Sequence, residues 1–193
     1  MATKYIVNNL TGQTISGQQL QPYKVYTALL TQSGSGTEDT INSGTTVVGV
    51  TYTINQESTG MDFTNIGAPN NVVGTSFVAT GTVPNSWGQG ATYTLAYNAG
   101  APTVKVLENT IGNIYFTYQA TGQYSVDTYP DTLFTIGKTT GFIASVGDDA
   151  AAASYGFLRP VGSDRFYILT NDVEFNNING FLINTPIEIR VYN

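Results

Sequence analysis

Three pairs of carboxylates have the types and spacing to do chemistry in this 193-residue chain. Two carboxylates suffice for glycoside hydrolysis, one as acid and the other as base or nucleophile. Asp172 and Glu174 are predicted to project from one face of a strand, because alternate strand residues share a face. The other pairs are Asp127 with Asp131 and Asp148 with Asp149. In a strand-rich chain, acidic residues as sparse as these more often form turns or lie at solvent-exposed strand edges. We therefore interpret the three pairs as structural rather than catalytic.

Two residue types on which many catalytic sites depend are missing, because the chain contains no histidine and no cysteine. This removes the commonest general base, disulfides and the usual zinc ligands. Neither a G-x-S-x-G elbow nor a phosphate-binding P-loop occurs. For calcium the best candidate is Asp148-Asp149, which lacks the D-x-D-x-D-G pattern and is better explained as a helix cap or acidic turn. We therefore expect no enzyme activity, no metal and no cofactor.

The charge balance also argues against two classes of partner, nucleic acids and anionic membranes. Thirteen acidic residues against seven basic ones give a formal net charge of -6, which disfavours nucleic acid and anionic membranes. The sequence shows neither a secretory signal pattern nor an apolar run of about 20 residues, the length of a membrane span. We expect synthesis in a cytoplasm, without a signal peptide.

Short runs rich in β-branched and aromatic residues, punctuated by glycine and proline, predict an all-β fold with an antiparallel β-sandwich or barrel-like core. Asn179-Gly180 and Ala120-Thr121-Gly122 are predicted hairpin turns. Residues 62–67 and 148–153 each fit a single helical turn or a loop. The predicted strands are residues 4–7, 23–31, 45–54, 75–80, 91–97, 103–107, 114–118, 123–127, 132–136, 142–146, 165–169, 173–175, 181–183 and 187–192.

Two glycine-rich segments, residues 33–36 and 99–101, are the best candidates for linkers. They divide the chain into a core unit of residues 1–32 plus 102–193 and a small inserted β module of residues 37–98. One continuous domain with a long excursion is the alternative.

Aromatic residues are the candidates for binding. Trp87, the single tryptophan, lies in a loop with Asn85 and Gln89, where it fits either a sugar-binding platform or the core of the insert. A second candidate is a tyrosine cluster that fits either the core or an exposed interface. Few lysines are available to protect strand edges, so we expect a homo-oligomer, with a trimer favoured over a dimer. The tyrosines are Tyr115, Tyr118, Tyr124 and Tyr129.

Four segments resemble modules of virion structural proteins of tailed bacteriophages. The segments are YKVYTALLTQSG at residues 23–34, the stretch at residues 101–126, NTPIEIRVYN at residues 184–193, and the insert-like stretch at residues 49–93. The resemblance implies a non-enzymatic capsid decoration, head fibre or small tail appendage in the virion. Such a subunit would dock on capsid or tail proteins and on its own copies, with the insert as the exposed tip. The alternative is a carbohydrate-binding module that recognises a host surface glycan through Trp87.

Overall fold

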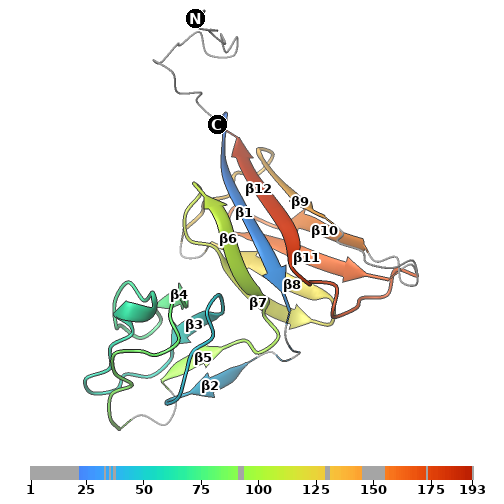
Figure 1. The fold of residues 1–193 in the computed structure, drawn as a ribbon. Coiled ribbons are helices and arrows are strands. Elements are labelled where there is room, and N and C mark those ends of the chain that lie inside the picture. Colours follow the sequence, from blue (N-terminus) through green and yellow to red (C-terminus); the bar gives the residue numbers. More distant parts are fainter. Residues whose placement is uncertain are drawn as a thin grey trace, which may run out of the picture.

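The structure, a computed structural model, describes residues 22–32, 34, 36, 38–90, 94–128, 131–144, 155–172 and 174–192, with the backbone alone at 155 and 157. The described chain forms three antiparallel sheets of four strands each and a single turn of 3-10 helix, which confirms the predicted all-β fold (Figure 1). The strands are β1 (Tyr23–Thr31), β2 (Asp39–Ile41), β3 (Thr51–Ile54), β4 (Ser76–Val78), β5 (Leu95–Tyr97), β6 (Thr103–Asn109), β7 (Tyr115–Ala120), β8 (Gln123–Asp127), β9 (Thr139–Ile143), β10 (Tyr155–Pro160), β11 (Arg165–Asn171) and β12 (Thr185–Tyr192).

Two of the sheets pack face to face as a sandwich. One has the strand order β6-β1-β12-β9 and the other β10-β11-β8-β7. On β12, Ile187, Ile189 and Val191 are buried, whereas Glu188 and Arg190 between them are only partly buried. This period of two places one face of the strand in the core and the other outside.

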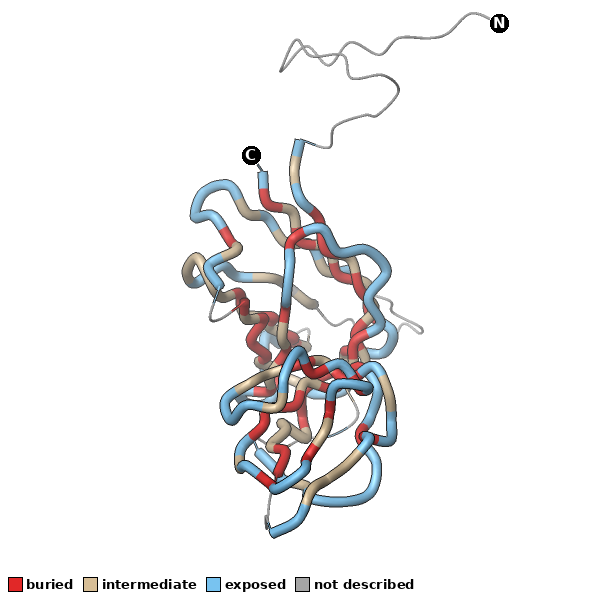
Figure 2. The backbone as a smooth tube through the Cα atoms, turned by 90° about the vertical axis from the view of Figure 1, so that its left-hand side faces the viewer, coloured by how far each residue is buried: buried red, intermediate tan, exposed pale blue. Residues whose placement is uncertain are grey.

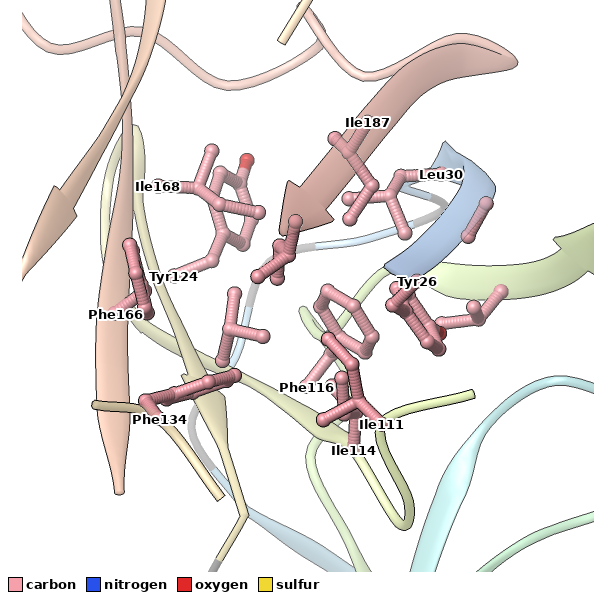
Figure 3. Packing of buried hydrophobic residues seen from close by; sticks show 14 of the residues in the cluster. Tyr26, Leu30, Ile111, Ile114, Phe116, Tyr124, Phe134, Phe166, Ile168 and Ile187 are labelled. Atoms are coloured by element: carbon pink, nitrogen blue, oxygen red, sulfur yellow. The ribbon is translucent and has the colours of Figure 1, made fainter. Parts of the chain in front are cut away.

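The sandwich core is built from large side chains of both sheets, including Tyr26, Phe116, Tyr124 and Phe166 (Figure 3). Phe134 adds to it from the segment after β8, and its ring meets that of Phe166 edge-on at 4.8 Å between centroids. On one side of the sandwich β9 and β10 lie close together, because Gly141 has no side chain to hold them apart. A Cβ at Gly141 would lie 2.8 Å from Cβ of Leu158.

The third sheet has the order β2-β5-β3-β4 and lies wholly within residues 39–97. It carries a separate hydrophobic cluster that includes Tyr52, Ile54, Phe63 and Phe77, so buried residues occur in two clusters (Figure 2). The predicted helical turn at residues 62–67 is a 3-10 turn, η1 (Thr64–Ile66), which ends at Gly67 in the left-handed conformation with φ 109°. The strand predicted over residues 45–54 is confirmed only over the four residues of β3.

The two predicted linkers lie side by side, and Gly100 N donates to the carbonyl of Gly36 at 3.0 Å. Such closely spaced ends are what an inserted module requires. The division into a core unit and an insert of residues 37–98 stays a prediction, and the term insert is used here for that segment.

The insert covers exposed strand edges of the sandwich. Asn98 hydrogen-bonds both backbone groups of Tyr118: its Nδ2 donates to the carbonyl and its Oδ1 accepts from the N–H, each at 3.0 Å. On the edge strand of the other sheet, Val104 N donates to the carbonyl of Gly49 at 3.1 Å. These contacts satisfy backbone groups that an edge strand otherwise presents to other chains.

Several sequence predictions were wrong. Residues 132–136 and 181–183 form no strand, and the described part of the predicted strand at 173–175 is a turn. The turn forms because Asp172 Oδ1 accepts hydrogen bonds from the backbone N–H groups of Glu174 and Asn176, each at 2.9 Å. Asn179-Gly180 therefore joins no hairpin, whereas Thr121-Gly122 does connect β7 to β8. Residues 4–7 and 148–153 lie outside the described residues.

Candidate functional site

Trp87 packs into the insert. Its ring meets that of Phe63 edge-on at 5.5 Å between centroids, and it packs against the insert's hydrophobic cluster. Its Nε1 donates to the carbonyl of Gly44 at 3.2 Å, so the polar atom of the indole is used within the chain. The geometry supports the core interpretation, although Trp87 remains partly exposed.

Asn85, beside Trp87, takes part in a hydrogen-bonded hub at Asp62. Asp62 Oδ2 accepts from Asn85 Nδ2 at 2.9 Å, while Oδ1 accepts from Thr64 Oγ1 at 2.7 Å and from Thr64 N at 3.0 Å. Donation from Thr64, with a further share from Asn85, holds the pKa of the Asp62 carboxyl well below its ordinary value. The hub joins the segment that leads into η1 to the loop that carries Trp87.

Gln89 is exposed and forms an isolated antiparallel bridge with Thr59. Its carbonyl also accepts from Ser58 Oγ at 3.2 Å. The backbone of Gln89 is thus part of the scaffold, and its side chain is open to solvent.

The tyrosines separate into two kinds. Tyr118 and Tyr124 are buried, their rings meet edge-on at 5.8 Å, and their hydroxyls bond Asn179 and Gln32, so both are core residues with polar tips. Burial raises the pKa of the Tyr124 phenol well above its ordinary value. Tyr115 is partly buried, and its hydroxyl donates to the carbonyl of Ser76 in the insert at 3.3 Å. Tyr129 lies outside the described residues.

Three of the candidate carboxylates, Asp127, Asp172 and Glu174, have partners within the chain. Asp127 forms an ion pair with Arg165 and accepts a hydrogen bond from Ser125, on the outer face of β8. Asp172 and Glu174 lie in the turn described above, where both carboxylates contact the Asn176 side-chain amide. Among the described residues, no three acidic side chains gather as a metal site requires. Asp148 and Asp149 fall outside those residues.

The outer face of the first sheet carries an aromatic and arginine cluster that the sequence analysis missed. Arg190 lies over two rings, 4.8 Å from the centroid of Tyr23 and 5.3 Å from that of Phe142. It also forms an ion pair with Glu188. The rings of Tyr23 and Tyr192 lie 5.4 Å apart. We call these five residues, Tyr23, Phe142, Glu188, Arg190 and Tyr192, the Arg190 patch.

Register brings the patch together. Tyr23 on β1 pairs with Tyr192 on β12, and Phe142 on β9 pairs with Glu188 on β12. Phe142 is 52% exposed and Tyr192 is 36% exposed. The alternation at residues 188, 190 and 192 was visible in the sequence, but the position of β9 beside β12 was not.

Comparison with protein-family models, curated proteins and solved structures found no match. In the part of the chain that the structure describes, no helix has the length and apolar character needed to cross a membrane. The fold is that of an antiparallel β-sandwich protein, and the outer face of one of its sheets carries the Arg190 patch.

Proposed function

We propose that this protein is a non-enzymatic structural subunit that works by docking and self-association, and that its setting is the exterior of a tailed phage particle. The observation that carries the docking role is the Arg190 patch. The phage setting rests on the resemblance of the four sequence segments described above.

The patch has the chemistry of a protein interface. Tyrosine and arginine are enriched among the residues that dominate binding energy at interfaces. Arg190 is held between two rings and an acid, so less of its side-chain freedom is lost when a partner covers it. The exposed Phe142 ring provides apolar area to bury. A sheet face with these side chains suits a second copy or a capsid or tail protein.

Light scattering across a concentration series tests self-association. We expect a closed oligomer, with a trimer favoured over a dimer, whose mass is constant over the micromolar range. A monomer at every concentration would remove self-association from the proposal.

A carbohydrate-binding role is the second candidate, and the partial exposure of Trp87 near the exposed Gln89 favours it. A glycan array tests this role. Binding that Trp87→Ala abolishes while the fold persists would support it, and no binding to any glycan would leave the structural role alone.

A further inference from the structure

A concave surface lies where the insert meets the sandwich. It is a hollow of about 550 Å³ between β6, an edge strand of the sandwich, and β4, an edge strand of the third sheet. We call it the β4–β6 groove. Its lining residues that carry the argument are Val48, Gly49, Val78, Lys105, Val106 and Asn184.

The groove has an apolar lining that remains open to solvent. Val48 is 51% exposed and Val106 is 48% exposed, and Val78 lies opposite on β4. Apolar side chains exposed together in a concave site are typical of a binding surface.

Lys105 is the only charged residue in this lining. Its side chain forms no ion pair or hydrogen bond with any other residue that the structure describes. Asn184 adds a polar side chain at a left-handed backbone position, φ 50°. No acidic side chain lines the groove to pair with the Lys105 ammonium, so an acidic group on a ligand is its local complement.

The edge of β6 adds backbone hydrogen-bonding groups. Val104 N faces the groove side of the strand, because it donates to the carbonyl of Gly49. Since alternate residues of a strand direct their backbone groups to the same edge, the N–H and carbonyl of Val106 face that side too. Gly49 makes the close approach possible: it has φ 87°, and a Cβ there would lie 2.6 Å from the Val104 carbonyl oxygen.

We propose that the β4–β6 groove binds an extended polypeptide segment with an acidic side chain between apolar ones, added along β6. The backbone of Val106 pairs with the segment, the valines receive its apolar side chains, and Lys105 pairs with its acid. Gly49 already covers the edge of β6 at Val104, so the added segment pairs with β6 at Val106, beyond that contact. The groove adjoins the end of β1 opposite to Tyr23, so this site is separate from the Arg190 patch and does not depend on self-association.

The test is a nuclear magnetic resonance titration of the full chain with three synthetic peptides. They are Ac-Thr-Val-Glu-Val-Thr-NH2 and its Gln and Lys analogues at the central position. We expect saturable shifts at the amides of Gly49, Lys105 and Val106, and binding of the Glu peptide about threefold tighter than the Gln peptide, the scale of an exposed ion pair.

Charge-reversal variants distinguish recognition of the acidic side chain from non-specific binding. Lys105→Glu is expected to reverse the preference, so that the Lys peptide binds best, whereas Lys138→Glu, outside the groove, leaves the order unchanged. Shifts spread over other surfaces, equal affinity for the three peptides, or an order unaffected by Lys105→Glu would each overturn the proposal, as would no binding at all.

Discussion

At the scale of single residues, the polar side chains near the predicted binding loop have structural partners. Asp62 joins Thr64 to Asn85, and Trp87 donates its indole N–H to Gly44. A sugar-binding loop would instead keep its donors and acceptors for the ligand. Two substitutions test this structural role.

Asp62→Asn should change the acid dependence of stability. The folded-state pKa of Asp62 lies below its ordinary value of 3.8, mainly through donation from Thr64. Its contribution is therefore present above that ordinary value and is lost as the pH falls through the lower folded-state value. We expect urea unfolding of the variant to depend less steeply on pH below about 4.

Glu57→Gln is the matched control, because Glu57 is exposed and bonds no other residue that the structure describes. It should retain the slope of the original protein. An unchanged slope in Asp62→Asn would show that the hub does not couple to folding.

Trp87→Ala should destabilise the protein by about 2 kcal/mol, less than a fully buried tryptophan costs because the ring is partly exposed. Trp87→Phe keeps an aromatic ring beside Phe63 and should cost about half as much. Urea unfolding followed by circular dichroism measures both. Equal, near-zero losses would mean that Trp87 does not support the insert.

The sequence left Trp87 open between a sugar-binding platform and the core of the insert, and its packing against Phe63 supports the core interpretation. It did not identify the Arg190 patch, because Phe142 and Arg190 are 48 positions apart and meet only through strand register. The Asp62 hub is likewise a product of tertiary structure. The type of a residue indicates which interactions its side chain can make. The pairing of strands in the fold decides which side chains become its neighbours.

At the scale of elements, strands with clear alternation were predictable. Residues 23–31 and 123–127 match β1 and β8, and residues 187–192 fall within β12. The missed strands, β2 and β10, are both edge strands. β2 has three residues, and β10 contains Gly156 and ends at Pro160, so neither shows the pattern of a half-buried strand.

A single substitution can remove the hydrogen bonds by which Asn98 caps the edge of β7 at Tyr118. Asn98→Ala deprives the buried Tyr118 of partners for both its N–H and its carbonyl, and we expect a loss of about 2 to 3 kcal/mol. Hydrogen exchange at the Tyr118 amide should accelerate. Asn113→Ala, at an exposed site, should change stability by less than about 0.5 kcal/mol, and a similar loss in both variants would contradict the capping role.

At the scale of the whole molecule, the insert and the sandwich can be tested as separate folding units. Because Gly36 and Gly100 are hydrogen-bonded, residue 36 can be joined directly to residue 99 without stretching the chain. We expect the shortened chain to melt cooperatively, at a lower temperature because β7 loses its cap. Loss of cooperative melting would refute the two-unit division.

We expect the molecule to associate through one particular sheet face, the one that carries the Arg190 patch. The chain provides a matched pair of surfaces, since Arg159 lies 5.6 Å from the ring centroid of Tyr167 on the outer face of the other sheet. The same chemistry can therefore be removed from either face.

The most direct measurement is sedimentation velocity of two double variants beside the original protein. Phe142→Ser with Arg190→Glu should sediment as a monomer, while Tyr167→Ser with Arg159→Glu should keep the mass of the original oligomer. An Arg190-patch variant that retains the full oligomer mass, or a control variant that loses it equally, would contradict the claim that this patch is the docking surface.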